Sequence, residues 1–212
     1  MLKIYITNLD KLNDEYIKNN GYILSAYWIE SINSVNAIKR KKEKIAGAVL
    51  CYKALLDLGI DEQSVSYKTS PNGKPIFDNL DNLYFNISHS DNAAILAISN
   101  QNVGIDIQKV NSNTKNIANR FFTRDENVYL SSLDNDLKND AFFRIWTIKE
   151  SYIKFSGNGL RTPLDSFNVI LNDNQAYIEN KKLCIQEYNL LPEYKVSVCL
   201  KEPENDTEIY FI

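Results

Sequence analysis

The sequence feature that most constrains the fold is the stretch WTIKESYIK, residues 146–154, where three charged residues interrupt an apolar and aromatic run. Around it, apolar side chains recur at spacings of three and four residues: Phe142, Ile145, Ile148, Tyr152 and Phe155. This period predicts an amphipathic helix over roughly residues 139–156. The glycines of Gly157-Asn158-Gly159 are a strong signal for the end of that helix.

The charged side chains of this helix have two interpretations. Glu150 and Lys154 stand four residues apart and share a helical face, as in an ordinary surface ion pair worth about 0.2–0.5 kcal/mol. The second interpretation comes from VGIDIQ, residues 103–108, because Asp106 and Gln108 point to the same side of a β-strand. A carboxylate and an amide can then converge on Glu150, and the helix and the strand together form a polar site.

Composition limits the class of protein. The 212 residues, 44% of them hydrophobic, support a substantial core in one large domain or two small ones. A net charge of −3 gives no general signal for nucleic acid or an anionic membrane. No apolar run approaches about 18 residues and no basic region precedes an apolar one at the N-terminus, so we expect neither a membrane span nor a signal peptide. The three cysteines, odd in number and far apart, predict reduced thiols in a cytoplasmic protein.

The N-terminal half, residues 1–102, is expected to combine strands with one long helix. The predicted strands are Leu2–Thr7, Val65–Lys68, Leu83–Ser88 and Ala93–Ser99, and the predicted helices are Asp14–Asn19 and about Val35–Leu58. The basic run Lys39–Lys44 lies near the start of the long helix and wraps more than one turn. Some of its charges are then solvated surface; the alternative is an anion site where one or two of them reach a phosphate.

The single histidine, His89, lies between Ser88 and Ser90 where two predicted strands connect. One histidine cannot form a multi-histidine metal site. A Ser/His/Asp hydrolase stays formally open, although the chain has no Gly-x-Ser-x-Gly turn. His89 is otherwise either a hydrogen-bonded loop histidine or an anion donor beside two hydroxyls.

The C-terminal half, residues 103–212, repeats the same kinds of element. Thr123 and Glu126 have the spacing of a capping box at a helix start. Besides the helix over residues 139–156, we predict a helix at Ile117–Phe122 and strands at Val103–Gln108, Phe167–Leu171, Leu183–Tyr188, Tyr194–Leu200 and Ile209–Ile212. The predicted fold class is α+β, with two similar halves packed in one chain around a pseudo-two-fold, each with antiparallel strands and a long helix. We expect them to supply both walls of one cleft, and hence a monomer.

Four motifs, taken in order, resemble the Sfp-type 4′-phosphopantetheinyl transferases: FNISHS at 85–90, GIDIQ at 104–108, RFF at 120–122 and WTIKES with its following lysine at 146–154. NGKP at 72–75 and the segment GNGL to PLDSFNV at 157–169 are also similar to the family. The resemblance runs from about Asn72 to Val169, close to half of the chain.

This resemblance implies that the phosphopantetheine arm of coenzyme A passes to a serine of an apo acyl or peptidyl carrier protein, with release of adenosine 3′,5′-bisphosphate. It makes Asp106 and Glu150 ligands of Mg²⁺, with Mn²⁺ as an alternative ion, and Gln108 a weak or water-mediated ligand. Glu150 would also accept the serine proton, and Lys154 would neutralise the leaving phosphate. Oxygen ligands suit Mg²⁺, and phosphoryl transfer depends on such positioning and charge neutralisation.

The resemblance also implies contacts to coenzyme A. These residues are Lys42, Lys44, Lys74, Ser88, His89, Lys149 and Lys154. For Lys149 an alternative stays open, which is pairing with an acid. The N-terminal half would hold coenzyme A contacts, and the C-terminal half the metal site and the carrier-protein contacts.

Two positions depart from the family pattern. Gln108 stands where the family's best-studied type carries a glutamate, and Glu43 stands where the family usually carries a basic residue, between Lys42 and Lys44. Two alternative functions are therefore also considered. One is a catalytically inactive protein that binds coenzyme A or a carrier protein, and the other is a Mg²⁺-dependent nucleotide pyrophosphohydrolase.

Overall fold

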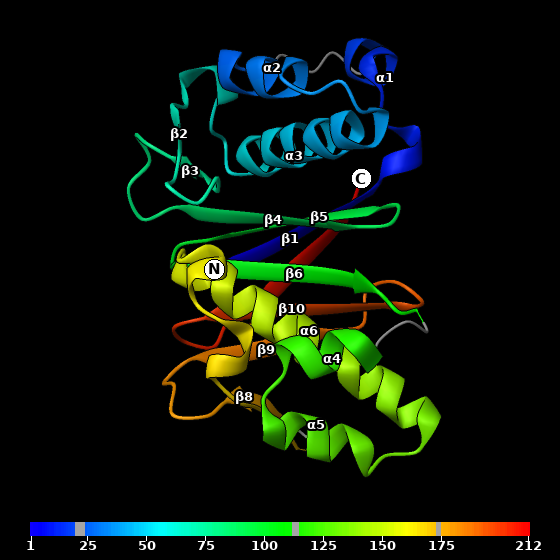
Figure 1. Ribbon diagram of the computed structural model, residues 1–212. Helices are drawn as coiled ribbons and strands as arrows, with labels where there is room; N and C mark the ends of the chain where they lie inside the picture. Colours follow the sequence, from blue (N-terminus) through cyan, green and yellow to red (C-terminus); the bar gives the residue numbers. More distant parts are fainter. Residues whose placement is uncertain (20–23, 112–114, 173–174) are drawn as a thin grey trace. The chain divides into compact units, whose positions relative to one another are not determined.

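The computed structural model describes residues 1–19, 24–111, 115–172 and 175–212, and the chain divides into two compact units (Figure 1). Unit 1 comprises Met1–Asn102 with Glu204–Ile212, and unit 2 comprises Val103–Pro203. Each unit combines antiparallel strands with one long helix. The predicted α+β class is confirmed.

Unit 1 is built on a four-stranded sheet in the order β11-β1-β5-β4. Its strands are β1 (Leu2–Asn8), β4 (Tyr84–Ser90), β5 (Ala93–Ser99) and β11 (Thr207–Phe211). The strand β5 pairs antiparallel with both β1 and β4, and all seven of its residues are buried, as expected for the apolar run AAILAIS. A second, two-stranded sheet joins β2 (Tyr67–Thr69) to β3 (Pro75–Phe77).

The C-terminal strand belongs to unit 1. We expected residues 204–212 in the C-terminal half, but β11 pairs in parallel with β1, with Ile209 opposite Ile4. The ring of Tyr210 also stacks on that of Tyr5, with centroids 4.8 Å apart. Backbone pairing and aromatic packing therefore hold the last residues on the first strand of the chain.

The helices of unit 1 lie on one side of its main sheet (Figure 1). They are α1 (Asp14–Asn19), α2 (Ala26–Asn33) and α3 (Ile38–Asp57), with short 3₁₀ turns at Leu9–Lys11 and Glu62–Ser64. The long helix α3 passes close to β4 at Gly47, where an added Cβ would lie 3.3 Å from Cδ1 of Ile87. A methyl group at this position would therefore require the Ile87 side chain to shift by a few tenths of an ångström.

Unit 2 is built on a three-stranded antiparallel sheet in the order β6-β10-β9. Its strands are β6 (Val103–Lys109), β9 (Cys184–Tyr188) and β10 (Tyr194–Leu200), with a small hairpin of β7 (Val169–Leu171) and β8 (Ala176–Ile178). Its helices are α4 (Lys115–Phe121), α5 (Arg124–Ser131) and α6 (Asn135–Ser156), followed by 3₁₀ turns at Gly159–Arg161 and Leu164–Ser166. The predicted capping box of Thr123 and Glu126 is present at the start of α5.

The helix α6 packs directly on β6 and β10. An added Cβ on Gly104 of β6 would lie 2.0 Å from the carbonyl oxygen of Ser151 and 2.4 Å from the backbone nitrogen of Phe155. Only glycine permits this approach of strand to helix, because backbone atoms cannot move aside as a flexible side chain does. As predicted, the helix ends at a glycine: Gly157 has a φ of 70° and donates its N–H to the carbonyl of Ile153.

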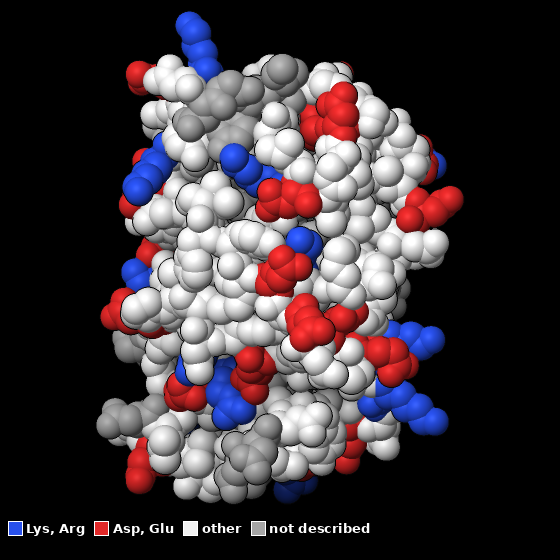
Figure 2. Space-filling view, turned by 180° about the vertical axis from the view of Figure 1, so that it is seen from behind, with Lys and Arg blue, Asp and Glu red and all other residues white. Residues whose placement is uncertain are grey.

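The surface carries charges of both signs, as the small net charge of −3 predicts. On the face that Figure 2 shows, acidic and basic side chains are interspersed and do not form one field of a single sign. Within the described ranges, no helix has both the length and the apolar character needed to span a bilayer.

Candidate active site

The strand β6 and the helix α6 bring the predicted acidic and basic residues of unit 2 together. Nζ of Lys154 donates to Oδ1 of Asp106 at 2.6 Å, and the amide of Gln108 donates to Oδ2 at 3.2 Å. Asp106 is only 1% exposed, whereas the Lys154 side chain is 24% exposed. The carboxylate therefore lies inside the unit and the ammonium at its boundary with solvent.

Glu150 lies one helical turn before Lys154, within electrostatic reach of Asp106. Burial raises the pKa of Glu150 above its usual value, the negative charge of Asp106 raises that pKa further, and Lys154 opposes the shift. Two carboxylates and one ammonium thus share a small region of low dielectric. Such an arrangement favours binding of a cation by the two carboxylates and of an anion by the Lys154 ammonium.

A divalent cation fits this set of donors. Asp106 and Glu150 supply carboxylate oxygens of the kind that Mg²⁺ prefers, and a cation held by both would relieve their mutual repulsion. Among the described residues, no cluster of three or more histidine, cysteine or acidic side chains is arranged to hold a metal. The remaining ligands would therefore be waters or substrate oxygens, which Mg²⁺ commonly keeps.

Gln108 directs its amide nitrogen toward Asp106. We expected this side chain to be a weak or water-mediated ligand through its oxygen. The hydrogen bond from its nitrogen orients the Asp106 carboxylate, and a ligand role through the amide oxygen stays a prediction. Lys154 occupies the other carboxylate oxygen, so both oxygens of Asp106 accept a hydrogen bond.

Lys149 lies in the interior, and the coenzyme A contact expected for it is corrected. Its side chain is 0% exposed, and its ammonium donates to the carbonyls of Leu164 at 2.8 Å and Phe167 at 2.6 Å. The ammonium also forms an ion pair with Glu126 at 2.8 Å. Burial lowers the pKa of Lys149 and the charge of Glu126 opposes that shift. A buried ammonium held by three oxygens cannot reach a soluble substrate, so pairing with an acid is the alternative that the structure favours.

The expected coenzyme A contacts of unit 1 lie on β4, at the turn before β3 and on α3. His89 lies within β4 and not in a loop, because the strand continues through Ser90. Its Nδ1 is 3.5 Å from Oε1 of Glu43 on α3, and its side chain is 41% exposed. Ser88 is 4% exposed and points to the opposite face of β4, as strand alternation requires. Lys74 follows the turn before β3, where its backbone N–H donates to the hydroxyl of Ser70.

The two lysines beside Glu43 differ in exposure. Lys42 is half-buried and Lys44 is exposed, both in the first half of α3. Two residues correspond to about 200° of helical rotation, so the two lysines point to different sides. A single ligand is therefore not expected to meet both.

Two hollows occur elsewhere in unit 2. One, of about 600 Å³, is lined by the β9–β10 connection and by Asp140, and the other, of about 420 Å³, by the start of α5 and residues 165–168. Neither is lined by a predicted site residue. The candidate site therefore consists of Asp106, Glu150 and Lys154, which line neither hollow.

Comparisons with known proteins all match one protein family. Residues 102–199 match the family model of the 4′-phosphopantetheinyl transferase superfamily. The chain is 38% identical over 158 residues to 4′-phosphopantetheinyl transferase Sfp of Bacillus subtilis, covering 72% of this chain and 70% of the relative. It is 38% identical over 167 residues to 4′-phosphopantetheinyl transferase gsp of Aneurinibacillus migulanus, covering 76% and 70%. It is also 26% identical over 219 residues to L-aminoadipate-semialdehyde dehydrogenase-phosphopantetheinyl transferase of Rattus norvegicus, covering 84% and 71%.

Proposed function

This chain belongs to the 4′-phosphopantetheinyl transferase superfamily, and we propose that it transfers the 4′-phosphopantetheine arm of coenzyme A to a serine of an apo acyl or peptidyl carrier protein. Adenosine 3′,5′-bisphosphate is the second product. The observation that carries this proposal is the group formed by Asp106, Glu150 and Lys154, with the Lys154 ammonium 2.6 Å from the buried Asp106 carboxylate.

Each of these side chains has a role in the proposed transfer. The serine oxygen attacks the phosphorus on the pantetheine side of the pyrophosphate, and the bond from that phosphorus to the bridging oxygen breaks. Glu150 takes the serine proton, directly or through a water. Lys154 offsets the negative charge that develops on the departing phosphate, since its ammonium lies at the solvent boundary.

Magnesium, or manganese in its place, is part of the proposal. Held by Asp106 and Glu150, the ion would draw negative charge from the pyrophosphate and align it for attack. Gln108 orients the Asp106 carboxylate through its amide, and Lys154 holds the second carboxylate oxygen until an anionic substrate offers the ammonium another partner.

The coenzyme A contacts in unit 1 stay proposals that rest on the family resemblance. His89 and Lys74 are the better supported, because the His89 side chain is 41% exposed and Lys74 leaves an exposed turn. Lys42 or Lys44 would add a cation, and Ser88 is the least accessible of the set at 4% exposure. We also propose a monomeric, cytoplasmic protein, in keeping with the cysteines Cys51, Cys184 and Cys199, all of which are free thiols.

One assay separates this function from its alternatives. The protein is incubated with coenzyme A, Mg²⁺ and an apo carrier protein, and the intact mass of the carrier is measured. A gain of one phosphopantetheine arm supports the transferase. Nucleotide release without any change in the carrier would indicate the pyrophosphohydrolase, and binding with neither product would indicate an inactive binding protein.

A further inference from the structure

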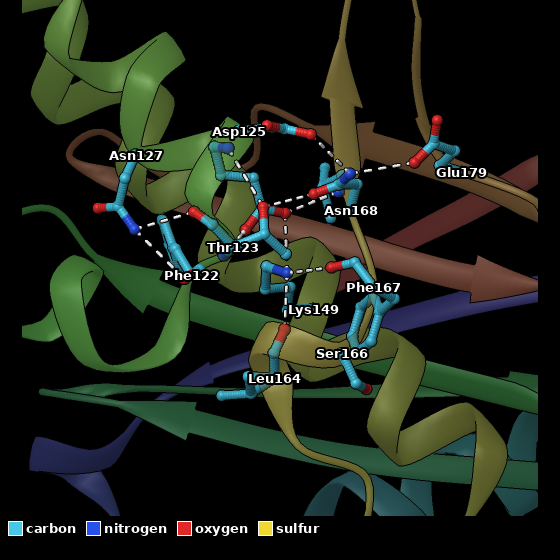
Figure 3. Close-up of polar contacts among 12 residues, drawn as sticks. Phe122, Thr123, Asp125, Asn127, Lys149, Leu164, Ser166, Phe167, Asn168 and Glu179 are labelled. Atoms are coloured by element: carbon cyan, nitrogen blue, oxygen red, sulfur yellow. Dashed lines mark hydrogen bonds and ion pairs between the residues drawn. The ribbon is translucent and has the colours of Figure 1, made fainter.

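Lys149 is the one charged residue of the signature WTIKESYIK that the proposed chemistry leaves without a role. Figure 3 shows its ammonium between the carbonyls of Leu164 and Phe167. The ammonium also lies 4.4 Å from the centroid of the Phe167 ring and pairs with Glu126. A flexible four-carbon side chain is thereby held in one position by acceptors from separate segments of the chain.

Glu126 is held as firmly as its partner. Its Oε1 accepts the ion pair from Lys149 and the backbone N–H of Val169, the latter at 2.7 Å. Its Oε2 accepts the backbone N–H of Thr123 at 2.8 Å, which closes the capping box of α5. The glutamate is 3% exposed, so this buried acid connects α5, α6 and the first residue of β7.

A second layer of contacts surrounds the ion pair (Figure 3). The hydroxyl of Thr123 bonds to the amide oxygen of Asn168, and the amide nitrogen of Asn168 donates to Glu179 at 3.0 Å. The amide of Asn127 donates to the carbonyls of Phe122 at 3.2 Å and Thr123 at 2.9 Å. The turn before α5 and residues 164–169 therefore form a rigid support for the Lys149 side chain.

This support acts on α6 from one side while β6 acts from another. Lys149 precedes Glu150, so its side chain leaves the helix about 100° away from that of Glu150. Across the helix, Gly104 of β6 meets the backbone at Ser151 and Phe155. A helix in contact at two points on different sides has neither a free rotation about its axis nor a free slide along it.

We propose that Lys149 and Glu126 are positioning residues for the transfer reaction, fixing the rotation of α6 so that Glu150 and Lys154 face Asp106. The inference rests on the proposed function for its catalytic consequence. A buried ion pair is a poor device for stability alone, because the loss of hydration offsets most of the attraction. Three donors on three fixed oxygens do, however, select a single orientation of the helix, which apolar contacts specify less sharply.

The test compares two pairs of residues on the same helix. The double variant Lys149→Met with Glu126→Gln removes the buried charges together, and the control Arg144→Met with Glu187→Gln removes a part-exposed ion pair of α6 whose atoms are 2.8 Å apart. Both are measured at a temperature where circular dichroism shows complete folding. The readouts are kcat and KM for coenzyme A, together with hydrogen–deuterium exchange of the amides of residues 148–155.

Positioning predicts a specific pattern. The buried double variant should lose at least about tenfold in kcat, since a displacement of about 1 Å costs up to about 100-fold in well-aligned reactions. Its KM for coenzyme A should change by a smaller factor than kcat, because Lys154 is only one of several proposed contacts to coenzyme A. Exchange in residues 148–155 should accelerate, because the lost contacts hold α6 in place. The control variant should keep kcat and exchange at the wild-type values.

Several results would overturn the inference. They are a folded buried variant with wild-type kcat and exchange, a loss of kcat that disappears on cooling to a temperature of greater stability, and an equal loss in the control. If the double variant does not fold, Glu126→Gln alone keeps an acceptor for Lys149 and is held to the same criteria. A wild type that transfers no arm would refute the proposed function, and the exchange data would then decide the positioning role alone.

Discussion

The buried ion pair leads to a prediction about stability that depends on charge and not on size. Methionine matches lysine in being long and unbranched, so Lys149→Met fills the same space but leaves no cation beside Glu126. The side chain of Glu126 is 2% exposed and that of Lys149 is 0% exposed. The substitution therefore leaves a carboxylate in the interior of unit 2 without its counter-ion.

The magnitude follows from the contacts that remain. Breaking a buried ion pair from one side costs about 3–5 kcal/mol. Glu126 keeps the backbone N–H groups of Val169 and Thr123, so we expect the lower end, about 3 kcal/mol. The carbonyls of Leu164 and Phe167 lose their donor in both variants. Adding Glu126→Gln removes the unpaired charge, at the cost of one backbone N–H that then faces an amide nitrogen, about 1 kcal/mol. The double variant should then be more stable than Lys149→Met.

The assay is urea unfolding followed by tryptophan fluorescence. The chain has two tryptophans, Trp28 in unit 1 and Trp146 in unit 2, so a Trp28→Phe background reports unit 2 alone. Arg144→Met serves as the control and should cost less than about 1 kcal/mol, because its ion pair with Glu187 is part-exposed. The reasoning is refuted if Lys149→Met costs no more than this control, or if the double variant is the less stable of the two.

Three further predictions concern the site and unit 1. Asp106→Asn should lower the transfer rate by at least about 100-fold with the fold retained, whereas Gln108→Ala should lower it by less than about tenfold. Mg²⁺ titrations of activity measure both effects. Equal losses would contradict the distinct roles proposed for these two residues. His89→Ala should raise KM for coenzyme A more than it lowers kcat, and steady-state kinetics showing the reverse would remove the proposed contact. Burial raises the pKa of Glu62 above its usual value, although Tyr67 donates a hydrogen bond to the carboxylate, so the folded state holds this proton more tightly than the unfolded state does. The stability that Glu62 contributes is fully present below its unfolded-state pKa and is lost as pH rises through its folded-state pKa. Glu62→Gln should therefore make the urea midpoint of unfolding fall less steeply between these two pH values. An unchanged dependence of the midpoint on pH would contradict this prediction.

Local patterns predicted the helix α6, the capping box and the strand β10 closely. For α6, the 3.6-residue period and the terminating glycine are both local features of the sequence. The short elements α2, β3 and β8 were not predicted, since strands of three residues and a helix of two turns show too little of either period. The pairing of β11 with β1 was missed because it joins residues about 200 positions apart, which no local pattern encodes.

The candidate site shows the same division. The i, i+4 spacing and strand alternation were sufficient to bring Glu150 and Lys154 to Asp106. The direction of Lys149 was not predictable, because a helical period does not say what lies beside the helix. Glu126 was recognised only as a cap residue, although a buried acid that also meets Val169 is what turns Lys149 inward. The sequence shows Glu126 as an acidic residue of a helix start, but its partner Lys149 is 23 residues away along the chain, and no local pattern connects the two.

The charge around Asp106 explains why an amide at position 108 is compatible with the proposed reaction. Asp106 already interacts with the Lys154 ammonium, and burial together with the charge of Asp106 raises the pKa of Glu150, so a further negative charge nearby would be unfavourable. A third carboxylate in place of Gln108 would add repulsion in the absence of a cation, whereas the amide donates a hydrogen bond to Asp106. When the pyrophosphate is bound, it brings its own negative charge to any cation held there, so the missing carboxylate matters least in the complex that reacts. Gln108→Glu should therefore tighten Mg²⁺ binding measured by calorimetry without coenzyme A and leave the saturated rate nearly unchanged. A saturated rate that rises in parallel with Mg²⁺ affinity would show instead that the charge at position 108 acts on the reaction itself.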